Sequence, residues 1–126
     1  DVAHNPQAAR AFSDNVGAMG FHPRTLAVFA IMSDKDIDAV IAAMAKRVDL
    51  WLVAPLPPPR GAAASLLVER LARAGIAMDA IHTFYSAAKA YAAARGMALE
   101  ADRIIVFGSF LTVAAALAQA YDRMSR

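Results

Sequence analysis

The feature that most constrains the fold is an alternation of short apolar runs with longer stretches of helical periodicity. Residues Thr25–Met32, Leu50–Ala54 and Arg103–Phe107 form three almost continuously apolar runs. Strands with this pattern are covered on both faces, as in a parallel sheet packed between helices. Ile81–Phe84 is a shorter, weaker run of the same kind. The sequence therefore predicts four strands that are largely buried.

The stretches between these runs carry apolar residues three and four positions apart, the spacing of a helix with one buried stripe. We predict helices over residues 6–19, 37–48, 62–74 and 87–97, and a last helix after Ser109. Asp36 and Ser86 are expected to cap the second and fourth of them. The expected inner stripes are Ala8, Phe12, Val16 and Met19; Ile37, Val40, Ile41, Met44 and Val48; Ala64, Leu67, Val68 and Leu71; Ala87, Ala90, Tyr91 and Ala94; and Phe110, Ala114, Leu117, Tyr121 and Met124.

Strand and helix thus alternate along the chain, which predicts one α/β domain over residues 1–126. Its expected form is a Rossmann-like, doubly wound, mainly parallel sheet with helices on both faces. Ligands of such sheets bind beyond the carboxyl ends of the strands. The loops expected at that edge are residues 1–6, 33–36, 55–61, 85–86 and 108–112. The proline run in the third loop either fixes the path of the loop or serves as a ligand for a proline-binding module.

Composition excludes several classes of function. The chain has 126 residues, no cysteine and a net charge of +2, with its basic residues scattered. Scattered charge predicts no nucleic-acid partner, and no apolar run is long enough to predict a membrane span. The lack of cysteine fits a cytoplasmic protein. No metal site is expected, because the histidines at 4, 22 and 82 lie far apart. The chain also lacks a phosphate-binding loop motif.

The first six residues, Asp1-Val2-Ala3-His4-Asn5-Pro6, place an acid and an imidazole directly before a helix. Asn5 suits the N-cap and Pro6 suits the first helical position. Free N–H groups and the helix dipole favour an anion at such a helix start. Asp1 and His4 would then flank the anion. The alternative is that both are solvated loop residues beside a capped helix.

Three motifs together resemble the folylpolyglutamate synthase/dihydrofolate synthase family, and specifically its C-terminal domain of the Mur ligase type. They are residues 1–6, Ser33-Asp34-Lys35-Asp36 after a strand, and Phe107-Gly108-Ser109-Phe110. The resemblance implies an ATP-dependent ligase of folate biosynthesis. In this reaction ATP phosphorylates the carboxyl group of dihydropteroate or folate, and the amine of L-glutamate attacks the acyl phosphate.

The resemblance also implies that the chain is a fragment that is inactive alone. A central ATPase domain, outside this sequence, would hold the phosphates of ATP and the Mg²⁺ ion, and the present domain would close over it. Nucleotide contacts would fall to Asp1, on the ribose side, and to His4 and Asn5. His4 would also lie near the incoming amino acid, which makes it a catalytic candidate.

For the substrate, the resemblance implies that Ser109 binds or orients the carboxylates of glutamate, as a second catalytic candidate beside a helix start. Lys35, flanked by Asp34 and Asp36, would meet an anionic group of the substrate. The alternative for Lys35 is a solvated loop position. Two other hypotheses stay open for the whole chain: the C-terminal domain of a peptidoglycan Mur ligase, and a stand-alone, non-catalytic α/β binding module. We expect a monomer.

Overall fold

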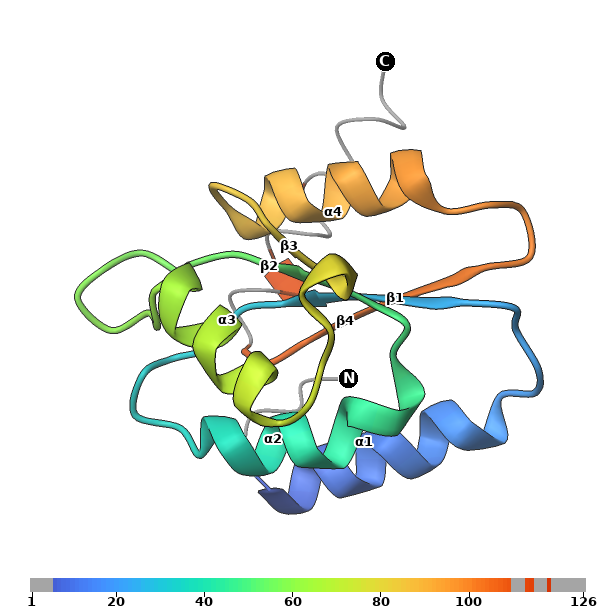
Figure 1. Cartoon of the computed structure of the whole chain (residues 1–126), viewed down its shortest axis with the longest axis horizontal. Helices are drawn as coiled ribbons and strands as arrows, with labels where there is room; N and C mark the ends of the chain where they lie inside the picture. Colours follow the sequence, from blue (N-terminus) through green and yellow to red (C-terminus); the bar gives the residue numbers. More distant parts are fainter. Residues whose placement is uncertain (1–5, 110–112, 115–117, 119–126) are drawn as a thin grey trace.

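The predicted parallel α/β fold is confirmed by the computed structural model, which describes residues 6–109, 113, 114 and 118. The strands are β1 (Thr25–Phe29), β2 (Leu50–Val53), β3 (Ile81–Thr83) and β4 (Arg103–Phe107). They form one sheet in the order β3-β2-β1-β4, and every neighbouring pair is parallel (Figure 1). In the register, Ala27 of β1 lies beside Trp51 of β2 and Ile105 of β4.

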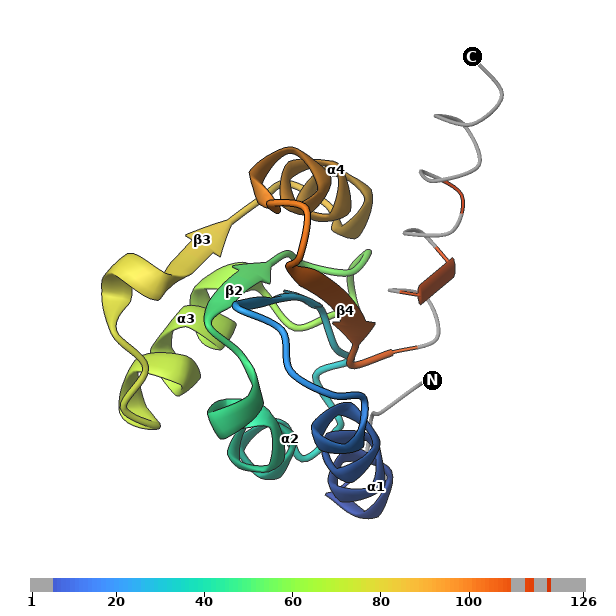
Figure 2. The ribbon, with the colours of Figure 1, turned by 90° about the vertical axis from the view of Figure 1, so that its right-hand side faces the viewer.

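Helices cover both faces of this sheet, as predicted (Figure 2). They are α1 (Pro6–Ala18), α2 (Ile37–Met44), α3 (Ala64–Arg73) and α4 (Ala87–Met97), with short 3₁₀ turns at Ala45–Arg47 and Met78–Ala80. The larger core lies between the sheet and α1, α2 and α3, and the smaller one lies under α4. Of the predicted last helix, only residues 113, 114 and 118 are described, and they are helical.

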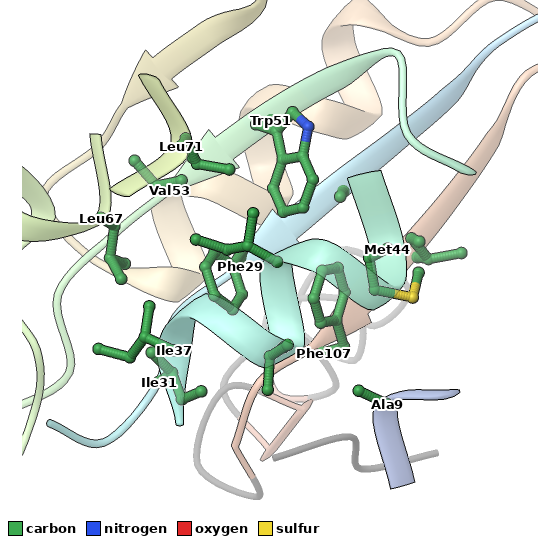
Figure 3. Close-up of a cluster of buried hydrophobic side chains, with 14 of the residues drawn as sticks. Ala9, Phe29, Ile31, Ile37, Met44, Trp51, Val53, Leu67, Leu71 and Phe107 are labelled. Carbon is green, nitrogen blue, oxygen red and sulfur yellow. The ribbon is translucent and has the colours of Figure 1, made fainter. Parts of the chain in front are cut away.

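Side chains alternate between these two cores along each central strand. Leu26 and Val28 of β1 enter the smaller core, and Phe29 enters the larger one. There Phe29 stacks on Phe107 with ring centroids 5.0 Å apart, and Trp51 meets Phe29 edge-on at 5.6 Å (Figure 3). Such aromatic pairs contribute about 0.5–1.5 kcal/mol each beyond their area burial. Because Phe29 and Phe107 end β1 and β4, their contact holds together the two strand ends that carry the candidate site.

Three details of the sequence prediction were wrong. Met19 is 61% exposed rather than buried, because α1 ends at Ala18. Val16 is buried as predicted and Phe12 packs against the core, but Ala9 and Ser13 are the other buried residues of α1. The run from Thr25 leaves the sheet after Phe29, and Met32 forms an antiparallel bridge with Gly61. The helix expected to reach Val48 stops at Met44 and continues as a 3₁₀ turn.

Candidate functional site

The boundary between the adjacent strands β1 and β4 is a topological switch point of the sheet, where the strand order reverses. The crossovers from β1 to β2 and from β2 to β3 step outward in one direction, and the next crossover returns to β4 on the other side of β1. Ligands of open parallel sheets bind in the crevice at such a switch point, beyond the carboxyl ends of the strands. Residues 33–36 follow β1, and Gly108 and Ser109 follow β4. The topology therefore brings two of the three sequence motifs to the position where a ligand is expected.

Gly108 makes the close approach of these two strand ends sterically feasible. Its φ is +113°, a conformation that L side chains rarely adopt, and a Cβ at this position would lie 2.3 Å from the carbonyl oxygen of Ala30. The next residue, Ser109, is only 4% exposed, and its carbonyl accepts a hydrogen bond from the N–H of Val113 at 3.3 Å. Ser109 thus lies between a buried strand and a helical turn, as predicted.

The loop after β1 carries one acid that caps a helix, Asp36, and two charged side chains that do not, Asp34 and Lys35. Asp36 caps α2, since its Oδ1 accepts a hydrogen bond from the N–H of Ala39 at 3.1 Å. The N–H of Lys35 closes a turn onto the carbonyl of Met32 at 3.2 Å. Within the described chain, the side chains of Asp34, which is exposed, and Lys35, which is half-buried, make no hydrogen bond or ion pair. Asp34 and Lys35 are therefore free to contact a ligand.

The structure thus brings Ser109, Lys35 and Asp34 to one edge of the sheet, on the ends of two adjacent strands. The other predicted site residues, Asp1, His4 and Asn5, lie outside the described residues. Sequence reasoning did not single out Arg60, whose loop after β2 is hydrogen-bonded to Ser33. Its position could have indicated it, because Arg60 directly follows the proline run in a loop already expected at this edge.

The remaining described histidines contribute nothing to this site. The Nδ1 atom of His22 lies 3.1 Å from the carbonyl oxygen of Ala101, at the opposite edge of the sheet, and His82 is half-buried on β3. Among residues 6–109, 113, 114 and 118, no group of three or more His, Asp or Glu side chains is placed to hold a metal ion. Within the same residues, no helix is long and apolar enough to span a membrane.

A hollow of about 380 Å³ lies at the same edge beyond β2 and β3. Its walls come from three elements and consist of Pro55, Ala64, Thr83, Phe84 and Tyr85. Strands in a sheet are about 4.8 Å apart, and the order β3-β2-β1-β4 places this hollow about two strand spacings from the switch point between β1 and β4. It is separate from the positions of Lys35 and Ser109.

The strand order and the parallel pairing define a Rossmann-like domain with a topological switch point between β1 and β4. Residues 1–110 match the family model described as Mur ligase, glutamate ligase domain. The chain belongs to this family.

Individual relatives confirm the narrower resemblance to folylpolyglutamate synthase/dihydrofolate synthase. The chain is 41% identical over 114 residues to the dihydrofolate synthase/folylpolyglutamate synthase of Escherichia coli K12, with 90% of this chain and 25% of that protein covered. A solved structure of E. coli FolC in complex with ADP, without folate substrate, has a TM-score of 0.89 and 39% identity, and the match covers 100% of this chain and 29% of that one. The chain thus spans about a quarter of the length of the curated relatives that it matches.

A further solved structure concerns the amino acid substrate. It is a bifunctional folylpolyglutamate synthase/dihydrofolate synthase with Mn, AMPPNP and L-glutamate bound. Its TM-score to this chain is 0.85 at 37% identity, and the match covers 96% of this chain and 28% of that one.

Proposed function

We propose that this chain is the C-terminal domain of an ATP-dependent ligase that joins L-glutamate to dihydropteroate or folate through an acyl phosphate. The observation that carries the proposal is the switch point between the adjacent parallel strands β1 and β4, where Lys35 follows the first strand and the buried Ser109 follows the second. A relative of the same fold binds L-glutamate together with Mn and AMPPNP, which supports this amino acid as the ligand.

In this proposal the domain contributes orientation and charge. A helix start favours a carboxylate through its free N–H groups, and the Ser109 hydroxyl would add a charge-assisted hydrogen bond. Lys35 would supply a cation for an anionic group of the substrate. Holding the glutamate amine beside the activated carboxyl group converts a bimolecular attack into an effectively intramolecular one. Asp34, on the same loop, would border the substrate.

The proposed nucleotide contacts come from residues 1–5. Asp1, His4 and Asn5 are proposed to contact ATP, and His4 also to lie near the incoming amino acid. Relatives have been solved with ADP and with AMPPNP and Mn, which supports a nucleotide and a divalent ion in the complete enzyme. The Mg²⁺ ion and the phosphates of ATP would be held by the central ATPase domain, which the present sequence does not include. Cytoplasmic location and a monomeric state stay predictions.

The full-length protein provides the test. Incubation with ATP, Mg²⁺, L-glutamate and dihydropteroate or folate should give ADP, inorganic phosphate and a product heavier by one glutamate residue, detected by mass spectrometry. The 126-residue chain alone should form no amide bond, because it has no phosphate-binding loop motif. Activity with a peptidoglycan precursor in place of the folate compounds would favour the peptidoglycan ligase. A full-length protein with neither activity would favour the stand-alone binding module.

A further inference from the structure

The loops after β1 and β2 are joined by a short antiparallel ladder. The N–H of Ser33 donates to the carbonyl of Arg60 at 2.7 Å, and the Ser33 hydroxyl donates to the same oxygen at 3.1 Å. Met32 and Gly61 form the bridge, and the N–H of Ala62 donates to the carbonyl of Ile31 at 2.9 Å. The two loops lie together at the left-hand end of the sheet in Figure 1. Arg60 is therefore fixed opposite Ser33, two positions before Lys35.

Gly61 allows this ladder to form at close range. A Cβ at Gly61 would lie 2.2 Å from the carbonyl oxygen of Leu56, so the loop folds back on itself only with glycine there. The N–H of Gly61 also donates to the carbonyl of Pro57 at 3.3 Å. The backbone of Arg60 is thus held from its own loop and from the loop after β1.

The side chain of Arg60, by contrast, makes no hydrogen bond or ion pair with the residues that the structure describes. The described arginines other than Arg10 and Arg60 each donate a side-chain hydrogen bond within the protein; they are Arg24, Arg47, Arg70, Arg73, Arg95 and Arg103. Arg10 lies on α1, whereas Arg60 is exposed at the edge that carries Lys35. The backbone of Arg60 is hydrogen-bonded to Ser33, two positions before Lys35, so neighbouring loops carry two cations that have no side-chain partner among the described residues. Such an arrangement is suited to bind an anion.

We infer that Arg60 is a further substrate-binding residue that, with Lys35, binds one carboxylate of the incoming amino acid. The inference rests on the proposed function. L-Glutamate carries two carboxylates, and its amine forms the new bond, so both carboxylates stay charged and need separate partners. Ser109 and its helix start serve one of them; Arg60 and Lys35 serve the other. The guanidinium binds a carboxylate through two parallel hydrogen bonds, which a single ammonium group does not reproduce.

The test compares Arg60→Ala, Arg60→Lys and the control Arg10→Ala in the full-length enzyme. Arg10 is the matched control because it is the other described arginine without a side-chain partner. Arg60→Ala should raise the KM for glutamate roughly 10- to 100-fold and leave the KM for ATP unchanged. Arg60→Lys should lie between Arg60→Ala and wild type, and Arg10→Ala should equal wild type. The melting temperature should stay the same in all three, because neither arginine side chain makes a hydrogen bond or ion pair within the described residues.

Glutamine and the α-amide of glutamate then identify the carboxylate. Each analogue lacks one of the two charges, and Arg60→Ala should no longer raise the KM of the analogue that lacks the charge bound by Arg60. Equal increases in KM for glutamate and for both analogues would overturn the inference, as would a Arg60→Ala enzyme with the same kinetics as Arg10→Ala. In both cases a wild-type enzyme that joins glutamate leaves the proposed function intact. A wild-type enzyme that does not join glutamate would overturn the proposed function and this inference together.

Discussion

Charged side chains have different surroundings at the two ends of the strands, which we call the amino edge, where the strands begin, and the carboxyl edge, where they end. At the amino edge, Arg24 donates to the carboxylate of Asp102 at 2.8 Å, and Arg103 donates to the hydroxyl of Thr25 at 2.6 Å. At the carboxyl edge, Lys35 and Arg60 have no side-chain partner within residues 6–109, 113, 114 and 118. The ion pair and hydrogen bonds at the amino edge thus stabilise the fold, whereas in our proposal the cations Lys35 and Arg60 at the carboxyl edge bind a ligand.

Close packing and hydrogen bonds nevertheless hold the described backbone at the carboxyl edge. Gly108 packs against the carbonyl of Ala30, and Ser33 holds the carbonyl of Arg60. A site whose supports are fixed before a ligand arrives loses less conformational entropy on binding. We therefore expect substitutions of backbone-determining residues at this edge to affect folding, and substitutions of the proposed ligand-binding side chains to affect kinetics.

The largest effect is expected for Gly108→Ala. A positive φ costs an L residue about 1–2 kcal/mol, and the added Cβ would also lie 2.3 Å from the Ala30 carbonyl oxygen. We expect a loss of more than about 2 kcal/mol in the free energy of unfolding and loss of most ligase activity in the full-length enzyme. Urea unfolding of the 126-residue chain can be followed by the fluorescence of Trp51, its sole tryptophan, which is fully buried.

Gly75→Ala is the matched control for this substitution. Gly75 has a φ of +94°, but a Cβ there would meet no atom within 4 Å. Gly75→Ala should therefore cost only the backbone contribution of about 1–2 kcal/mol and leave kinetics unchanged. Equal losses for the two variants would show that the contact between Gly108 and Ala30 is unimportant.

Ser109→Ala should have the next largest effect. If the hydroxyl binds a glutamate carboxylate, its removal costs about 1.5–3 kcal/mol and raises the KM for glutamate roughly 10- to 100-fold. A change in KM without a change in kcat is expected when the contact is equally strong in the ground and transition states. Steady-state kinetics of the full-length enzyme with glutamate as the varied substrate measures both constants.

The competing role for Ser109 is a helix cap. Ser86→Ala provides the comparison, since the Ser86 hydroxyl oxygen accepts a hydrogen bond from the N–H of Lys89 at 3.1 Å and caps α4. Loss of a cap costs about 0.5–2 kcal/mol of stability, and Ser86→Ala should leave the KM for glutamate unchanged. If Ser109→Ala lowers the melting temperature and also leaves this KM unchanged, Ser109 is a cap as well.

The contrast between the edges also explains what sequence could and could not predict. Caps and strand ends are local, so Asp36, Ser86 and the position of Ser109 followed from spacing and residue type. The end of β1 at Phe29 was missed, because an apolar run does not reveal that β2, the strand beside it, ends at Val53. The seven buried residues from Thr25 to Ile31 look alike in sequence, although only the first five form the strand.

Contacts between residues far apart in the sequence could not be predicted from local sequence patterns. Arg60 reaches the site through hydrogen bonds to Ser33, and the link from Arg24 to Asp102 joins residues far apart in the chain. Nothing in the spacing of these residues indicates that they meet. The parallel topology is what brings them together, so they became visible only once the strand order was known.

The smallest effect is expected for Asp102→Asn at the amino edge, and it should depend on pH. Hydrogen bonds from the N–H of Leu99 and from Arg24 hold the pKa of the Asp102 carboxyl below its usual value. Its side chain is 2% exposed. Because the folded-state pKa is lowered, the carboxylate stabilises the fold fully above the usual Asp pKa of about 3.9, and this contribution is lost as the pH falls through the folded-state value.

Asp102→Asn should therefore lower the melting temperature of the chain by a small amount at neutral pH, and the difference from wild type should shrink as the pH falls below about 4. Thermal unfolding between pH 3 and pH 7 measures this, with Glu100→Gln as the control. Glu100 is exposed in the same loop and has no ion pair within the described chain, so its replacement should leave the melting temperature at neutral pH unchanged. The KM for glutamate of the full-length Asp102→Asn enzyme should equal that of wild type, since the amino edge is assigned to stability alone. A raised KM, or a difference in melting temperature that is the same at pH 3 and pH 7, would contradict the division between the two edges.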